Sequence, residues 1–273
     1  MEHSISRGSG RRWFRVAIIV FALVIAAVPL ARPTPAAAVS DRCQAGVIFI
    51  GVRGTGANAG TNPSGPNLWL SGGHGDQVEP VRAKFAASLG SYLWSASLNY
   101  PATGPGSYIT SQQTGTQRLI NELNLITACV YDPPIVLAGH SQGADVIAQA
   151  LAHNGLSDAA KAQVKAVILY GDPLWKAGMN FNAPGYASSG HGLLGGRGAY
   201  WTDRLQSWYW QYGWPYQGAG QGYFSRIRSY CFTNDWACQN LLQSTSTNST
   251  HNSYKNIAQS AFEWAQYMTA NTN

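Results

Sequence analysis

Along this chain, short apolar runs alternate with longer stretches in which apolar residues recur at helical spacing. The apolar runs are typical of buried strands, and the helical spacing indicates amphipathic helices. The expected strands are Gly46–Ile50, Ser97–Tyr100, Ile135–Ala138, Val164–Tyr170 and Ser225–Tyr230, and the expected helices are Val81–Leu89, Tyr108–Ala128, Ala144–Leu151 and Tyr254–Thr269. This alternation predicts a compact α/β domain with a small central parallel sheet flanked by helices.

One strand-to-helix junction carries a Gly-x-Ser-x-Gly pattern, Gly139-His140-Ser141-Gln142-Gly143. In that context the pattern indicates a nucleophile elbow, in which a strained turn lifts the serine hydroxyl out of the sheet. The glycines allow the strand and the helix to approach closely. The alternative is a Gly-rich turn with an incidental serine. The flanking strand and helix favour the elbow, so Ser141 is the predicted nucleophile.

The first forty residues have the pattern of a secretory leader. Four arginines at 7–15 precede an apolar stretch, Val16–Leu30, and a small-residue exit, Pro33–Ser40. We therefore predict a signal peptide at 1–40 and a single domain at 41–273; an uncleaved membrane anchor is the alternative. The pair Arg11-Arg12 suggests twin-arginine export, but the surrounding pattern is incomplete and the export route stays open.

The net charge of +6 belongs mostly to this leader. Five of the 18 Lys and Arg residues and one of the 12 Asp and Glu residues lie within the first forty positions, which leaves a net charge of about +2 for the rest. That remainder has no cluster of basic residues that would predict binding to a nucleic acid or to an anionic membrane. We expect neither partner.

Four cysteines follow the leader, Cys43, Cys129, Cys231 and Cys238. An even number of cysteines in an exported protein predicts two disulfides, for which three pairings exist. We expect Cys231 and Cys238 to close a small loop and Cys43 to pair with Cys129 across a long one. Metal binding is the alternative, but the spacings typical of zinc sites do not occur.

A serine nucleophile requires a base that accepts its proton and a third group that orients the base. In α/β-hydrolase sheets the acid and then the histidine follow the serine along the chain. His251 lies in a polar loop after the last expected strand, and it is the predicted base. His191 is the second candidate, while His153 is expected to end the elbow helix and to point away. The side chain of His140 is expected to leave the turn in a different direction from that of Ser141.

For the orienting acid, position along the chain favours Asp235. It lies inside the expected small disulfide loop, which would hold a carboxylate rigidly. Asp172, after the preceding strand, is the main rival, although an Asp-Pro step more often forms a turn. Asp145 and Asp158 belong to the elbow helix and its exit.

The oxyanion hole requires N–H groups that point at the reacting carbonyl oxygen. One is expected from Gln142, directly after the nucleophile. The second is expected from the loop after the first strand, where Gly54, Thr55 and Gly56 lie, and the Thr55 hydroxyl is a further donor.

The segment Tyr200–Phe224 is crowded with aromatic residues and nearly lacks aliphatic ones. Aromatic side chains in a loop are suited to a lid, or to a platform for a lipid or a sugar ring. A loop that packs on itself is equally compatible with this composition.

The chain resembles the cutinase and acetylxylan esterase family of secreted serine esterases along nearly all of the residues after the leader. The resemblance rests on several motifs: Val47–Ile50, Arg53–Thr55, Gly139–Gly143, Gly171–Pro173, Arg228–Cys231, Asp235, Cys238, His251 and Tyr254. It implies a compact α/β hydrolase without a cofactor. It also implies Ser141 as nucleophile, His251 as base, Asp235 as acid, Thr55 with Gln142 as oxyanion hole, and the disulfides Cys43–Cys129 and Cys231–Cys238.

These observations together predict a secreted carboxylic-ester hydrolase that works through an acyl-enzyme intermediate on short- to medium-chain acyl esters. The expected partner is an ester substrate (a lipid, a polyester or an acylated polysaccharide), and we expect a monomer without a stable protein partner. One alternative is acyl transfer to cell-envelope lipids with the same three residues. Another is a non-catalytic lipid- or glycan-binding protein, which would lack one of the three.

Overall fold

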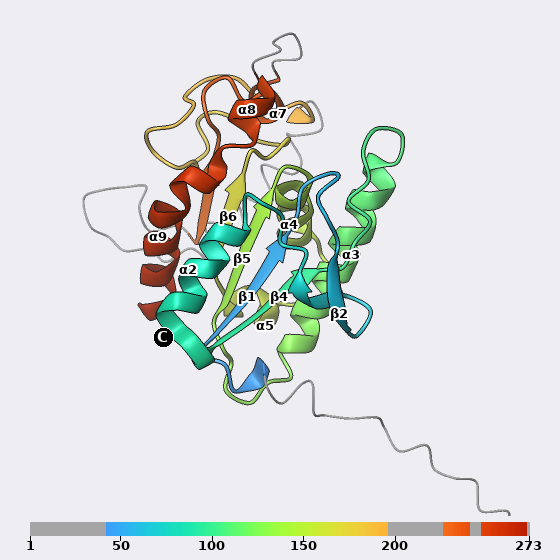
Figure 1. Cartoon of the computed structure of the whole chain (residues 1–273), viewed down its shortest axis with the longest axis vertical. Helices are drawn as coiled ribbons and strands as arrows, with labels where there is room; N and C mark the ends of the chain where they lie inside the picture. Colours follow the sequence, from blue (N-terminus) through green and yellow to red (C-terminus); the bar gives the residue numbers. More distant parts are fainter. Residues whose placement is uncertain (1–41, 196–225, 241–246, 272–273) are drawn as a thin grey trace, which may run out of the picture. The chain divides into compact units, whose positions relative to one another are not determined.

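The computed structural model describes residues 42–195, 226–240 and 247–271, all within one compact unit, Pro35–Asn273 (Figure 1). Two predictions lie outside the described residues: the signal peptide at 1–40 and the aromatic segment at 200–224. Nothing in the structure bears on either of them.

The described residues form a mixed sheet of seven strands in the order β2-β3-β4-β1-β5-β6-β7. Strands β4, β1, β5, β6 and β7 run parallel, and β2 and β3 form an antiparallel hairpin at one edge. Their bounds are β1 Val47–Val52, β2 Gly60–Ser64, β3 Leu68–Gly72, β4 Leu93–Leu98, β5 Ile135–His140, β6 Val164–Tyr170 and β7 Ile227–Tyr230. The parallel sheet is confirmed, but the sequence interpretation missed the hairpin.

Helices cover both faces of the sheet, as the α/β prediction requires (Figure 1). On one face, α3 and α4 pack together over a core that includes Ile48 and Ile50 of β1; on the other, α2 and α9 cover Val47 and Phe49. The helix bounds are α2 Glu79–Leu89, α3 Tyr108–Ile126, α4 Gln142–Ala152, α5 Asp158–Gln163, α7 Trp236–Gln239, α8 Thr247–His251 and α9 Ala258–Ala270, with short 3₁₀ helices at Gly90–Tyr92 (η1) and Tyr254–Ile257 (η3). Adjacent residues of β1 thus point to opposite faces, and both faces are buried.

The helices within the described ranges are too short or too polar to cross a membrane. Two disulfides are present, and they have the expected pairing. Cys43–Cys129 ties the segment before β1 to the turn after α3, and Cys231–Cys238 ties the residue directly after β7 to α7.

The parallel strands bring distant parts of the chain to one edge of the sheet. The loop with Thr55 follows β1, Ser141 follows β5, and Asp235 follows β7. Because these strands run parallel, the segments after them meet at the carboxyl edge, where ligands bind in open α/β sheets.

Candidate active site

Ser141 occupies a strained turn between β5 and α4, with φ 55° and ψ −122°. Its backbone N–H donates a hydrogen bond to the Tyr170 carbonyl oxygen at 2.8 Å. The turn requires glycine on the helix side, because a Cβ atom on Gly143 would lie 2.1 Å from the Val52 carbonyl oxygen. This geometry is that of a nucleophile elbow.

His251 and Asp235 form a buried, hydrogen-bonded pair. The His251 Nδ1 lies 2.8 Å from Asp235 Oδ1 and 3.0 Å from Oδ2. The close packing requires a glycine beside the pair, since a Cβ on Gly171 would lie 2.8 Å from Asp235 Oδ2. Because the carboxylate accepts from Nδ1, the other ring nitrogen, Nε2, is left with its lone pair.

The hydrogen bonds around Asp235 keep its carboxylate charged. Burial raises the pKa of Asp235, but hydrogen bonds from His251, from the Tyr254 hydroxyl and from the Ala237 N–H outweigh it, so the pKa is lowered from 3.8. The Ala237 contact is a helix cap, because Asp235 precedes α7 and its Oδ1 accepts from that N–H at 2.8 Å. The Ala237 N–H and the Tyr254 hydroxyl therefore hold the Asp235 carboxylate in place in addition to its contact with His251.

Tyr254 is a member of this network to which the sequence interpretation gave no role. Its hydroxyl donates to Asp235 Oδ2 at 2.5 Å and accepts from the Phe232 N–H at 3.0 Å. The ring is fully buried and stacks on those of Phe232 and Tyr170. Burial, together with the negative charge of Asp235, raises the tyrosine pKa well above 10.0, so the hydroxyl stays a neutral donor. The signal available in the sequence was the place of Tyr254 among the motifs that carry the family resemblance, three residues after His251.

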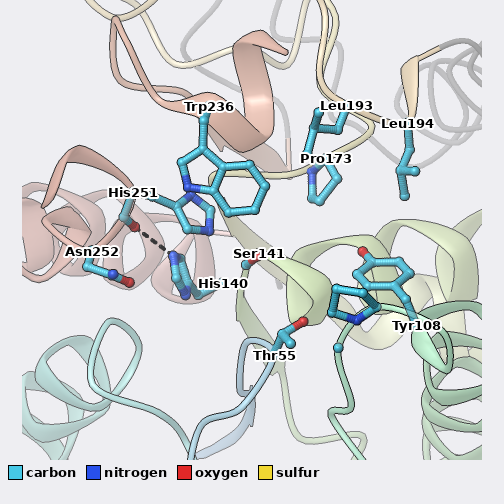
Figure 2. Close-up of a pocket in the computed structure, with 12 residues that line it drawn as sticks. Thr55, Tyr108, His140, Ser141, Pro173, Leu193, Leu194, Trp236, His251 and Asn252 are labelled. Atoms are coloured by element: carbon cyan, nitrogen blue, oxygen red, sulfur yellow. Dashed lines mark hydrogen bonds between the residues drawn. The ribbon is translucent and has the colours of Figure 1, made fainter. Parts of the chain in front are cut away.

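Ser141 and His251 border one pocket of about 500 Å³ (Figure 2). In Figure 2 the two sides of this pocket differ in chemistry. Pro173, Leu193 and Leu194 lie on one side of Ser141, whereas His251 and Asn252 lie on the other, with the Trp236 ring against His251. The pocket therefore offers an aliphatic wall on one side of the serine, and the imidazole, an amide and an indole ring on the other.

Thr55 also borders this pocket, and Gln142 is the first residue of α4. The Gln142 side chain is fully buried, and its Nε2 donates to the carbonyl oxygens of Thr103 and Tyr108 at 3.1 and 3.2 Å. The backbone N–H lies at a helix N-terminus, where such groups have no acceptor within the helix. Both residues expected to form an oxyanion hole thus flank Ser141.

Arg53 and Gly54, directly before Thr55, fix the position of the loop that carries it. The Arg53 guanidinium donates to the backbone carbonyl oxygens of Ala57, Leu98 and Tyr100. A Cβ on Gly54 would lie 3.3 Å from the Ser141 Cβ, so this loop packs directly against the elbow. Gly54 therefore allows the loop to lie close to Ser141, and the hydrogen bonds of Arg53 hold the loop there.

His140 contributes to the site although the sequence interpretation gave it no role there. Its side chain, expected to leave the turn in a different direction from that of Ser141, borders the same pocket, with Nε2 2.8 Å from the His251 carbonyl oxygen (Figure 2). A carbonyl only accepts, so Nε2 carries the proton and donates. Burial and the neighbouring His251 lower the pKa of His140 to about 3. The ring is therefore neutral at physiological pH.

The rival residues have other contacts. The Asp172 Oδ1 accepts from the Leu174 N–H at 2.8 Å, and burial and Asp145 raise the pKa of Asp172 to about 8.

The Nδ1 of His191 lies 3.0 Å from the Gly192 carbonyl oxygen, and the Nδ1 of His153 accepts from the Gly155 N–H at 2.9 Å. It is Asp235 that contacts His251. The predicted base also differs in setting, since it ends the short helix α8 rather than lying in a loop.

Within the described ranges, no cluster of three or more His, Cys, Asp or Glu side chains is placed to hold a metal ion. The carboxylates and imidazoles above instead contact one another and the backbone.

Comparison with known proteins places the chain among esterases. A sequence model of the cutinase family matches residues 43–268. Acetylxylan esterase 2 of Talaromyces purpureogenus is 30% identical over 138 residues, which cover 44% of this chain and 58% of that relative. The match thus spans little more than half of the relative's length.

Solved structures show the same fold. The catalytic core domain of acetyl xylan esterase from Trichoderma reesei superposes with a TM-score of 0.57 at 21% identity, covering 82% of this chain and 99% of that one. A cutinase-like protein from Cryptococcus sp. gives a TM-score of 0.59 at 19% identity, covering 82% and 94%.

Proposed function

We propose that this chain, which belongs to the cutinase family, is a secreted serine esterase that hydrolyses carboxylic esters. Family membership supports a carboxylic-ester hydrolase. The observation that carries the catalytic assignment is the hydrogen bond from His251 Nδ1 to Asp235 in the pocket that Ser141 borders. Serine, histidine and aspartate in this order along the chain fit the α/β-hydrolase arrangement.

In the first half of the reaction, the Ser141 hydroxyl oxygen attacks the ester carbonyl carbon while His251 Nε2 takes the hydroxyl proton. Negative charge develops on the carbonyl oxygen. The Gln142 N–H and Thr55 stabilise it, since donors at fixed positions need no reorganisation as the charge forms. The tetrahedral intermediate then collapses, the bond to the alcohol oxygen breaks, and His251 returns the proton to that oxygen. The alcohol leaves, and the acyl group stays on Ser141.

In the second half, water replaces the alcohol. His251 takes a proton from water, the resulting hydroxide attacks the acyl carbon, and the same donors hold the second tetrahedral intermediate. Collapse releases the carboxylic acid and returns the proton to the Ser141 oxygen. The charged Asp235 stabilises the imidazolium that forms twice in each cycle.

The apolar wall of the pocket suits the acyl half of the ester. Pro173, Leu193 and Leu194 contribute apolar surface beside Ser141 in a pocket of about 500 Å³. Removing apolar surface of the acyl chain from water contributes roughly 0.8 kcal/mol per methylene. We therefore propose short- to medium-chain acyl esters as substrates.

Two features support secretion. The leader pattern at 1–40 is that of a signal peptide, and two disulfides in one domain are typical of oxidising compartments. We propose that the chain from 41 onward acts outside the cell as a monomer, without a cofactor or a nucleic-acid partner.

Hydrolysis of p-nitrophenyl esters from acetyl to palmitoyl tests this function. The Ser141→Ala variant is expected to lose nearly all activity, while Ser260→Ala, an exposed serine on α9, serves as the matched control and retains it. The optimum is expected at short to medium chains. If the wild-type protein shows no turnover above Ser141→Ala at any chain length, the proposed function is wrong.

A further inference from the structure

Large apolar side chains are exposed at the end of the domain opposite the candidate active site. Within the described residues six such side chains are exposed, and five of them lie at the amino edge of the sheet, where the parallel strands begin. The sixth, Leu70, lies on the hairpin strand β3. We call the five the amino-edge patch: Tyr92, Leu125, Val130, Tyr131 and Tyr267.

Three members of the patch stand before two of the parallel strands. Tyr92 directly precedes β4, while Val130 and Tyr131 lie in the turn between α3 and β5. Strand β1 lies between β4 and β5 and runs parallel to both. The starts of β4 and β5 are therefore two strand spacings apart, about 10 Å, so the three side chains belong to the same end of the sheet.

The other two members end helices at the same edge. Leu125 lies in the last turn of α3, and Tyr267 lies in the last turn of α9. Beside Tyr267, the Gln266 side chain donates to the Ser88 hydroxyl at 2.8 Å, which joins the end of α9 to the end of α2. Figure 1 shows α2, α3 and α9 ending towards the side of the sheet where β1 and β4 begin, away from α7 and α8.

Val130 and Tyr131 are the most exposed members of the patch, at 86% and 78%. The turn that carries them is held at both ends. The Cys43–Cys129 disulfide precedes it, and Pro133-Pro134, with a fixed φ at each residue, leads into β5. A turn held in this way keeps its apolar side chains in water instead of letting them fold onto the core. Exposed apolar groups of this kind mark an interaction surface.

The charged groups nearest to this turn are engaged within the domain. Asp132, which follows Tyr131, accepts a hydrogen bond from the Gln163 side chain at 3.1 Å. Burial and the nearby Arg226 lower the pKa of Lys165, and Asp132 opposes that shift, so these three charges lie close together. The Arg226 guanidinium also donates to backbone carbonyl oxygens at and before the start of β6. The apolar side chains are therefore the groups at this edge that gain most from contact with another surface.

The chain that precedes the domain indicates which surface this edge meets. It joins the domain at the amino edge, where Cys43 is bonded to Cys129 directly before the exposed turn. The apolar stretch of the leader, Val16–Leu30, is followed by residues 31–41, which span at most about 40 Å when fully extended. A leader of this pattern enters a membrane during export. A membrane is therefore a surface within reach of this edge.

The make-up of the patch favours a lipid surface over a protein partner. Its members protrude from separate segments, before β4, before β5 and at the ends of α3 and α9. A stable protein partner requires a continuous complementary area of about 800 Å² on each side, whereas a fluid bilayer admits side chains at separate points. Three of the five members are tyrosines, which are enriched at membrane–water interfaces because the ring is apolar and the hydroxyl is polar.

We infer that the amino-edge patch docks the secreted domain onto the surface of a lipid membrane. Tyr92, Val130 and Tyr131 enter the headgroup region, and the contact is apolar, so it requires no anionic lipid. The carboxyl edge lies at the other end of the sheet, which leaves Ser141 open to esters in the water. Docking in this orientation keeps the enzyme at the membrane surface while its substrate comes from the surrounding medium.

Co-sedimentation of the secreted form, from residue 41 onward, with phosphatidylcholine vesicles tests the docking. The double variant Val130→Ser/Tyr131→Ser is expected to lower the partition coefficient at least about tenfold, since each replacement removes apolar surface from the contact. Leu70→Ser is the matched control: it removes an exposed apolar side chain outside the patch, and it keeps the wild-type partition. Sedimentation requires no turnover, so this result is independent of the proposed ester hydrolysis.

Hydrolysis of p-nitrophenyl acetate tests the orientation. Without vesicles, the double variant and Leu70→Ser are expected to match the wild-type rate, because the replaced side chains lie away from Ser141. Added vesicles should leave kcat/KM of the wild-type protein unchanged. A fall in kcat/KM as vesicles are added would place the edge with the active site on the membrane and would overturn the orientation.

Other results would overturn the docking itself. Equal partition of the wild-type protein and the double variant would show that the patch makes no contact with lipid. Release of the wild-type protein when NaCl is raised from about 0.1 M to about 0.5 M would show that charges hold it. Wild-type protein that stays in the supernatant and forms a dimer in sedimentation velocity, which the double variant abolishes, would assign the patch to a second copy of the chain.

Discussion

The His140 ring donates a hydrogen bond from Nε2 to the backbone carbonyl oxygen of His251, at 2.8 Å. His140, directly before the proposed nucleophile Ser141, thus contacts the backbone of His251, the proposed base, although 111 positions separate the two histidines in the chain. The two rings also lie close together, with centroids 4.5 Å apart. We conclude that His140 positions His251, and that the elbow and the short helix α8 are joined through this contact.

Replacing His140 by Phe tests this role. The variant keeps a ring in the site but removes the donor, and we expect kcat to fall about three- to tenfold, the effect of one neutral hydrogen bond. His140→Gln supplies an amide donor and should recover part of the loss. KM is expected to change little, because the contact is with the enzyme's own backbone. Equal kcat values for the Phe variant and the wild type would show that the contact does not position His251.

Tyr254→Phe tests the support of Asp235. The variant removes the donor to Oδ2 and leaves the Phe232 N–H without its acceptor, so we expect a loss of about 1 to 3 kcal/mol in the free energy of unfolding at pH 7. The folded pKa of Asp235 is below 3.8, so the carboxylate stabilises the fold above that value and loses this effect as pH falls through the folded pKa. The variant raises that pKa.

Urea unfolding of Tyr254→Phe and wild type at several pH values measures the effect. The stability difference should be largest near neutral pH and should shrink as pH falls below 3.8, where Asp235 becomes protonated in both proteins. A difference that stays constant with pH would mean that the tyrosine acts through packing alone.

Asp172 and Asp235 are both buried but should differ sharply as Asn variants. Asp235→Asn is expected to lower kcat about 10⁴-fold, because the amide no longer stabilises the imidazolium. Asp172→Asn should keep activity within a few-fold, since its side-chain oxygen still accepts from the Leu174 N–H. A large loss of kcat in Asp172→Asn, with Asp235→Asn active, would reverse the assignment.

The pH dependence of stability provides a second test of Asp172. Its pKa is raised from 3.8 to about 8, so between these values the folded state keeps a proton that the unfolded state loses. Stability therefore falls as pH rises through this window, and Asp172→Asn removes that contribution. We expect thermal unfolding to show the variant gaining on the wild type from pH 5 to pH 8. A constant difference across that range would contradict the raised pKa.

The two disulfides should separate stability from activity. The Cys43–Cys129 bridge spans 86 positions and the Cys231–Cys238 bridge spans 7, so loop entropy predicts stabilisation of about 4.6 and about 2.4 kcal/mol. Only the short loop contains Asp235. Serine replacement of the long bridge should therefore cost more stability, and replacement of the short bridge more kcat. Denaturant unfolding and ester kinetics on the two double variants measure both, and the opposite order in kcat would contradict the proposed role of the short loop.

The parallel sheet and its helices were predictable because their residues carry clear periodic patterns. Apolar runs such as Val164–Tyr170 match the observed strand at both ends, since a strand buried on both faces leaves a nearly continuous apolar signal, interrupted here by Lys165. The hairpin β2–β3 was missed because its residues are mostly exposed, and Gly60–Ser64 contains one proline, one glycine and no large apolar side chain. An edge strand of this kind has neither alternation nor an apolar run.

The candidate site was partly predictable for a similar reason. Chain order, the elbow pattern and the family resemblance indicated Ser141, Asp235 and His251, and the structure brings the last two into contact. The roles of Tyr254 and His140 depend on side-chain directions across elements far apart in the chain. Hydrophobic periodicity carries no information on such contacts. The direction of the His140 side chain depends on the loops that pack against the elbow, and the sequence pattern does not show how those loops fold.

Labelling with a fluorophosphonate, which phosphonylates activated serines, tests the central claim most directly. Mass spectrometry of the digested protein should find the label on Ser141, and the rate of labelling should fall at least about 10³-fold in His251→Gln because the serine is no longer deprotonated. Label on another serine, or labelling of Ser141 at an unchanged rate in His251→Gln, would contradict the assignment of Ser141 as nucleophile and His251 as its base.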